Sequence, residues 1–108
     1  MATMQEPTFL ILTALASGPL HGYGVMQQVS ALSQGSVTLR TGTLYGALDR
    51  LSEQGLIEVD REEAVDGRLR RYYRLAEAGA TALATEAARL RRHSDAAVAR
   101  LATRPATA

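Results

Sequence analysis

The chain has 108 residues, enough for one compact domain, and a formal net charge of +1. It contains two His and no Cys, which excludes disulfides and thiolate metal sites. We therefore expect neither a metal nor a cofactor. The overall charge does not indicate a nucleic-acid partner, so any such argument depends on where the charges lie.

The N-terminal region is apolar but does not resemble a targeting or membrane segment. No basic residue precedes Arg40, whereas a signal peptide begins with a charged region. The apolar run is also shorter than the roughly 20 residues that span a bilayer. We expect a cytoplasmic protein without a membrane partner.

Two helices are predicted in the first third of the chain. The first begins near Pro7, which a first helical turn tolerates, and stops at Gly18–Pro19. It is apolar on almost every side and should be central. The second runs from about Gly22 to Leu32, with its buried stripe formed by Val25, Val29 and Leu32.

A third helix is predicted from Thr41, a candidate N-cap, to the stop at Gly55. Its buried side carries leucines spaced i, i+4, i+7. They are Leu44, Leu48 and Leu51. The opposite side carries Gly42, Thr43, Gly46, Asp49, Arg50 and Glu53.

A basic hairpin follows the third helix. One strand begins at Leu56 and the other spans Leu69 to Leu75, with Asp66–Gly67 as a strong turn signal between them. Strand alternation should turn Tyr73 and Leu75 inward. The returning strand carries a cluster of basic residues, Arg68, Arg70, Arg71 and Arg74.

The last predicted helix runs from Glu77 to about Thr103, with a frayed tail from Arg104. Along it, a heptad-like stripe is spaced 4-3-4-3-4, although a serine and two alanines interrupt its leucines. A thin core and this stripe together favour pairing with a second copy. The stripe consists of Leu83, Ala87, Leu90, Ser94, Ala97 and Leu101.

The third helix has two interpretations. It is an ordinary amphipathic core helix, or it enters a DNA groove by its N-terminal half, where glycines allow close approach and free N–H groups suit phosphate. Asp49 and Glu53 would repel phosphates further along. In the second case Arg50 reaches a phosphate or a guanine edge.

The hairpin favours the DNA interpretation. Arg68 and Arg70, nearest the turn, are free to contact phosphates or a minor groove. For Arg71 and Arg74, ion pairing with the facing strand is an equal alternative. The acids available on that strand are Glu58, Asp60, Glu62 and Glu63.

No catalytic constellation is present. The chain has no Ser-His-Asp set, metal-ligand spacing or phosphate-binding glycine loop. His21 is expected to cap or pack, and His93 to lie on the surface. We therefore do not expect an enzyme.

Four segments in this order and spacing resemble the PadR family of winged-helix transcriptional regulators. They are GPLHGYG (18–24), GTLYGAL (42–48), LSEQGLIE (51–58) and GRLRRYYRLAEAG (67–79). The resemblance implies an α+β, mostly α fold: a winged helix-turn-helix of three helices and a two-stranded wing, with a C-terminal dimerisation helix. Residues 1–75 would form the DNA-binding domain, and residues 76–108 the dimerisation helix and tail.

The resemblance also implies a homodimeric repressor on a palindromic operator in double-stranded DNA, relieved by a small-molecule effector that it does not identify. The alternative is a protein-interaction module on the same scaffold. We expect dimer contacts from Leu83, Ala87, Leu90, Ala97 and Leu101. We expect DNA contacts from Thr41, Gly42, Thr43, Tyr45, Gly46, Arg50, Arg68, Arg70 and Arg71.

Tyr45 lies at the flank of its helix, where its hydroxyl braces a phosphate or its ring simply packs. Compared with the resembled family, Gly46 replaces a usual proline, Asp49 replaces a frequent basic residue, and Ala76 replaces a capping threonine. These departures should loosen the recognition turn, weaken or redirect DNA binding, and leave the last helix more mobile. The chain also lacks Trp, so a ligand sandwiched between tryptophans, as in some relatives, is unsupported.

Overall fold

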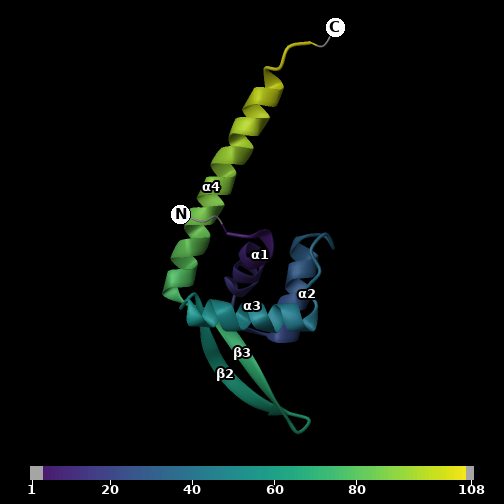
Figure 1. Cartoon of the computed structure of the whole chain (residues 1–108), viewed down its shortest axis with the longest axis vertical. Helices are drawn as coiled ribbons and strands as arrows, with labels where there is room; N and C mark the ends of the chain where they lie inside the picture. Colours follow the sequence, from purple (N-terminus) through teal and green to yellow (C-terminus); the bar gives the residue numbers. More distant parts are fainter. Residues whose placement is uncertain (1–3, 107–108) are drawn as a thin grey trace.

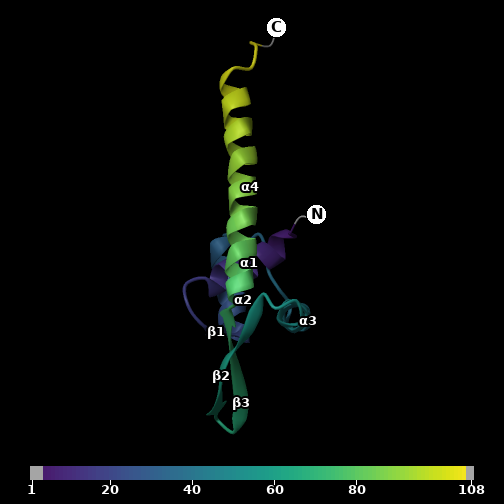
Figure 2. The same ribbon diagram turned by 90° about the vertical axis from the view of Figure 1, so that its left-hand side faces the viewer.

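The computed structural model describes residues 4–106 and forms a winged helix with a long C-terminal helix (Figure 1). That helix and the wing extend in opposite directions in both views (Figures 1 and 2), giving a longest extent of 67 Å. The elements in chain order are α1 (Glu6–Leu15), β1 (Leu20–His21), α2 (Gly22–Leu32), α3 (Thr41–Glu53), β2 (Ile57–Val65), β3 (Arg68–Leu75) and α4 (Glu77–Ala102).

One hydrophobic core joins the first three helices to the base of the wing. The helix α3 runs across the long axis, with α1 and α2 on one side and the wing on the other (Figure 1). Its leucine stripe is buried, as the i, i+4, i+7 spacing predicts. The largest fully buried side chains are Ile11, Leu12, Leu15, Val25, Val29, Leu44, Leu48, Leu51 and Ile57.

The sheet has one strand more than the sequence predicts. Its order is β1-β3-β2, and the two-residue strand β1 pairs Leu20 with Tyr73 and His21 with Tyr72. Two residues are too few to show strand alternation, so only pairing with the distant β3 identifies this strand. The predicted winged helix is otherwise confirmed.

The turn of the wing is the predicted one. Asp66 and Gly67 have φ angles of 51° and 76°, the pair of positive values that a tight type I′ hairpin requires. Tyr73 is buried and Leu75 is half-buried against the core, so both face inward as expected. The arginines on β3 therefore project where the alternation predicts.

Two local predictions about the helices are wrong. Thr41 is the first residue of α3 and not its N-cap. The N-cap is Arg40, whose backbone carbonyl oxygen accepts a hydrogen bond from the Leu44 N–H at 2.9 Å. Leu32, expected in the buried stripe of α2, is 46% exposed because it lies at the free end of that helix. In its place Leu39, in the loop before α3, enters the core.

The helix α4 is attached to the body only through its first turns. Leu83 packs against the core of its own protomer. Glu86 is buried and receives hydrogen bonds from Arg89 through both carboxylate oxygens, each at 2.7 Å. The C-terminal half of α4 projects away from the other elements (Figure 1), and residues 104–106 have no regular structure. The last two residues of the expected frayed tail lie outside the described residues.

Gly79, in the first turn of α4, touches the connection between α3 and β2. A Cβ there would overlap the carbonyl oxygen of Leu56 and lie 2.9 Å from its carbon. That oxygen accepts the backbone N–H of Ala76 at 3.0 Å, so it is not free to move away. Close approach of two backbones therefore requires glycine here.

We predict that Gly79→Ala lowers the free energy of unfolding by about 1–3 kcal/mol, because the added methyl forces the two backbones apart. The control is Gly46→Ala in α3, where a Cβ meets nothing within 4 Å. That variant should instead gain up to about 1 kcal/mol from helix propensity. Urea unfolding of both variants measures the difference, and equal effects would contradict this account of α4 docking.

Glu86 should make stability depend on pH. Its hydrogen bond from Arg89, assisted by the backbone N–H of Met4, holds the pKa of Glu86 below its ordinary value of 4.5. A carboxyl with a lowered folded-state pKa contributes stability at neutral pH and loses it as the pH falls through that pKa.

We predict that Glu86→Gln unfolds at lower urea than wild type at pH 7, and that this gap narrows as the pH falls below 4.5 and through the lowered pKa of Glu86. Glu53→Gln is the control, because Glu53 is exposed and forms no ion pair with the described residues. A gap that stays constant with pH would show that the pairing with Arg89 is not its cause.

Candidate nucleic-acid interface

The exposed side of α3 divides into two halves along its length. The predicted contact residues of its first half, Thr41, Gly42, Thr43, Tyr45 and Gly46, are all exposed. The N-terminal N–H groups of a helix have no partner within the helix and carry a partial positive charge. The second half presents carboxylates instead. The start of α3 thus has a favourable electrostatic environment for an anion, and the carboxylates Asp49 and Glu53 make the later part less favourable.

A groove of about 860 Å³ separates α3 from the wing. Tyr45 and Asp49 of α3 lie on one wall, and the end of β1 and the start of α2 contribute His21 and Gly22. The other wall is the turn and the first half of β3. There the groove is lined by Asp66, Arg68, Leu69, Arg70 and Arg71. The helix expected to read bases and the arginines expected to bind phosphate thus line the same groove.

Tyr45 both packs and remains exposed. A Cβ on Gly22 would lie 2.5 Å from the Tyr45 hydroxyl oxygen and 2.8 Å from the adjoining ring carbon, so the ring rests on the first residue of α2. The side chain is nevertheless 45% exposed in the groove. The packing against Gly22 fixes the position of the ring, and the rest of the side chain stays accessible from the groove.

The arginines of β3 fall into paired and unpaired members. Arg74 pairs with Glu58 at 3.2 Å and with Asp60 at 3.3 Å. Of the two alternatives for Arg74, phosphate contact and ion pairing with the facing strand, the structure therefore shows ion pairing. Arg71 pairs with Glu62 at 3.4 Å, but both side chains are about half exposed, and such a pair is worth at most about 1 kcal/mol. A phosphate can replace that carboxylate at little cost.

Arg68 and Arg70 make no ion pair with any residue of the described part of the chain. Arg68 is exposed next to the turn, and Arg70 is half-buried on the wall of the groove. Neither guanidinium is held in an ion pair, although Glu63 faces Arg70 across the two strands and attracts it at longer range. They are therefore the cations of the wing with the greatest capacity to bind an external anion.

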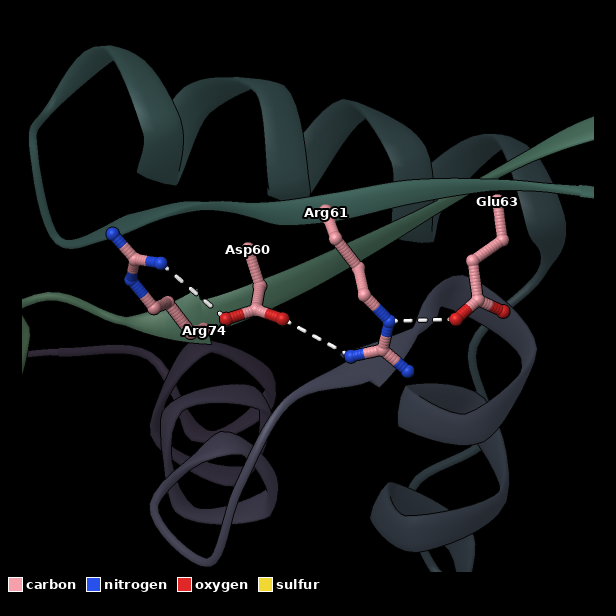
Figure 3. A network of polar contacts seen from close by, with 4 residues as sticks. All are labelled: Asp60, Arg61, Glu63 and Arg74. Atoms are coloured by element: carbon pink, nitrogen blue, oxygen red, sulfur yellow. Dashed lines mark hydrogen bonds and ion pairs between the residues drawn. The ribbon is translucent and has the colours of Figure 1, made fainter.

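A polar network joins side chains of β2 and β3 (Figure 3). Asp60 bridges Arg61 at 3.0 Å and Arg74 at 3.3 Å, and Arg61 also bonds Glu63 at 2.7 Å. The bond from Arg61 lowers the pKa of Glu63, which keeps the network ionised. It starts at an irregularity in the pairing between Val59 and Arg61, where β2 contains an extra residue.

His21 lies beside this network. Its ring lies 5.4 Å from that of Tyr72, and the guanidinium of Arg61 stacks over the Tyr72 ring at 3.9 Å. Partial burial and then the charge of Arg70 lower the pKa of His21, so the imidazole is neutral at pH 7. The packing role predicted for His21 is consistent with these contacts, but no pattern in the sequence indicates the contribution of Arg61.

Thr43 and Arg50 lie on the opposite flank of α3. They line a second groove of about 560 Å³ between α1 and α3, where Arg50 approaches the hydroxyl of Thr8 at 3.5 Å. The predicted DNA contacts therefore do not all converge on one groove. A helix inside a DNA major groove has a wall on each side, and this arrangement provides polar residues for both.

The predicted dimer stripe is exposed beyond its first member. Leu90 is 39% and Leu101 63% exposed, and Ala87 and Ala97 are also exposed. Val98, which the stripe did not include, is 64% exposed at its edge. Leu83 instead serves the core of its own protomer, so the free apolar face of α4 begins after it.

Within residues 4–106, no cluster of three or more metal-binding side chains occurs. No helix in that range is long and apolar enough to cross a membrane.

Comparison with known proteins identifies this architecture. Residues 11–85 match the transcriptional regulator PadR-like family. A transcriptional regulator of Mycobacterium tuberculosis is 41% identical over 73 residues, 68% of this chain and 64% of that protein. One of Escherichia coli is 38% identical over 58 residues, 54% of this chain and 28% of that protein. The match thus spans less than two thirds of either curated relative.

Solved structures share the fold. A PadR family transcription regulator from Clostridium difficile superimposes with a TM-score of 0.74 at 26% identity, covering 90% of this chain and 99% of that one. Bacillus subtilis PadR, solved in complex with operator DNA, gives a TM-score of 0.67 at 21% identity over 75% of this chain and 46% of that one. The chain belongs to the PadR-like family, whose members are transcriptional regulators and not enzymes.

Proposed function

We propose that the protein is a cytoplasmic homodimer that binds a palindromic operator in double-stranded DNA and represses transcription. Residues 1–75 would contact the DNA, and residues 76–108 would join the two copies. The observation that carries the proposal is the pair Arg68 and Arg70, two cations without carboxylate partners, across a groove from α3. The complex of Bacillus subtilis PadR with operator DNA supports it.

The groove between α3 and the wing has the features of a phosphate-binding channel. One strand of a duplex would run along this groove, with its phosphates against Arg68 and Arg70. Arg71 would join them by exchanging its exposed ion pair with Glu62 for a phosphate. The start of α3 would then enter the major groove, where Gly42 and Gly46 allow the backbone to approach the bases. Arg50, on the far flank, would contact the other wall.

The dimer rests on the free face of α4. This face carries Leu90, Val98 and Leu101, each more than a third exposed, on a helix that extends beyond its own protomer (Figure 1). A second copy would cover these side chains and remove their apolar surface from water. The two DNA-binding units would then be related by a two-fold axis, as a palindromic operator requires.

The proposal includes relief of repression by a small effector, as the family resemblance implies. The contact between two α4 helices is the place where a ligand would alter the spacing of the two wings. Because the chain lacks Trp, aliphatic side chains of α4 would have to provide any apolar contacts there.

We predict a steep salt dependence of operator binding. Four arginines per protomer (Arg50, Arg68, Arg70 and Arg71) would neutralise about eight phosphates per dimer, which gives a slope of log K against log salt of about −7. The double variant Arg68→Ala/Arg70→Ala should lose four contacts per dimer and reduce the slope to about −4.

Arg74→Ala is the matched control, because Arg74 is already paired with Glu58 and Asp60, and it should leave the slope nearly unchanged. Gel shifts on DNA from upstream of the gene, at several salt concentrations, measure all three slopes. Equal slopes for wild type and the double variant would refute the contact assignment. No binding to any DNA would favour the protein-interaction module instead.

We predict that the wild-type protein sediments as a dimer at micromolar concentration. Leu90→Glu/Leu101→Glu places charges in the proposed contact and should give monomers. Ala88→Glu/Ala99→Glu adds the same charges on the opposite face of α4 and should remain dimeric. Analytical ultracentrifugation separates the outcomes, and a monomeric wild type would overturn this part of the proposal.

A further inference from the structure

We propose that Asp49 is a specificity-determining residue: its carboxylate selects cytosine at one position of each operator half-site and penalises other DNA. The inference rests on the proposed DNA-binding function and deepens it. It starts from a lone carboxylate on the α3 wall of a groove that otherwise contains three arginines.

Asp49 faces the groove and not the protein. It lies one helical turn after Tyr45, so both side chains are on the flank of α3 that points to the wing. Its side chain is exposed, and it lines the same groove as Arg68, Arg70 and Arg71. Asp66, the other acid of this groove, belongs to the hairpin turn.

The absence of an ion-pair partner distinguishes Asp49 from the acids of β2. Each of the four carboxylates on that strand has a guanidinium group within 3.4 Å; they belong to Glu58, Asp60, Glu62 and Glu63. Asp49 forms no ion pair with any residue of the range 4–106, although three arginines line the same groove. Its charge is therefore available to whatever enters the groove.

A carboxylate in this position discriminates among bases because it only accepts hydrogen bonds. In the major groove guanine presents two acceptors, thymine an acceptor, and adenine an acceptor beside its amino group. Cytosine alone presents an amino donor without a neighbouring acceptor on the same base. Cytosine therefore compensates Asp49 best, because adenine places its N7 acceptor beside its amino donor, and guanine and thymine leave the carboxylate desolvated and unpaired.

The surroundings of Asp49 permit so short a side chain to reach a base edge. Gly42 and Gly46 lie on the outward side of the same helix, and a Cβ on either would meet nothing within 4 Å. Two missing side chains on that surface allow the helix to sit deep in a groove. On the side of α3 that faces the wing, the ring of Tyr45 packs against Gly22 and would limit how closely DNA approaches the helix.

The experiment is selection of binding sites from a random DNA library by the full-length wild type, Asp49→Asn and Glu53→Gln. Asparagine has nearly the same shape but pairs with adenine through N6 and N7. The position at which wild type selects cytosine should become adenine for Asp49→Asn, with the other positions unchanged. Glu53→Gln removes the same charge one turn further along, outside the groove lining, and should keep the wild-type preference.

Equilibrium titration gives a second measurement. Asp49→Asn should bind random DNA more tightly than wild type does, and its ratio of operator to random affinity should fall by about tenfold. Circular dichroism of each variant confirms that it is folded, which is expected because Asp49 is exposed.

Three results would overturn the inference. The first is an unchanged base preference for Asp49→Asn, and the second is an equal gain in affinity for operator and random DNA. The third is a Glu53→Gln variant that behaves like Asp49→Asn, because the effect would then be general repulsion. In all three the wild type still selects a sequence, so the proposed function stands; a wild type that selects none refutes both.

Discussion

Burial of Leu44, Leu48 and Leu51 fixes the rotation of α3 about its own axis, and the rest of the interface depends on that rotation. With these leucines in the core, Tyr45 and Asp49 must face the wing, and Thr43 and Arg50 must face α1. A rotation by one residue, about 100°, would bury a polar side chain and expose a leucine. The packing of hydrophobic side chains thus determines which polar groups meet a ligand.

The charges of the wing show a second constraint. Exposed ion pairs contribute little to stability, so the network of Asp60, Arg61, Glu63 and Arg74 acts mainly by orienting side chains (Figure 3). In this network Arg74, the arginine nearest the base of the sheet, is held in ion pairs, whereas Arg68 and Arg70 form none with the described residues. A chain with a net charge of only +1 thereby keeps two arginines free of ion pairs close to the turn.

Features that depend on neighbouring residues could be predicted from the sequence, and features that depend on distant contacts could not. The turn at Asp66–Gly67 and the bounds of α2 and α4 follow from local signals, and the structure confirms them. The strand β1 exists only because Leu20 meets Tyr73, more than fifty residues later. Likewise, only the folded chain shows that Arg74 is paired and Arg70 is not, because an extra residue in β2 decides which acids face β3.

The glycines in and around α3 differ in whether the fold itself requires them. Gly22 and Gly79 are required by the fold itself, since a Cβ at either would strike Tyr45 or the backbone of Leu56. Gly42 and Gly46 have no such reason, because each has open space around it. Each glycine inside a helix costs up to about 1 kcal/mol relative to alanine, so α3 is less stable than its own packing would allow. Nothing within residues 4–106 uses the space that these two glycines leave, whereas a molecule approaching α3 from outside would.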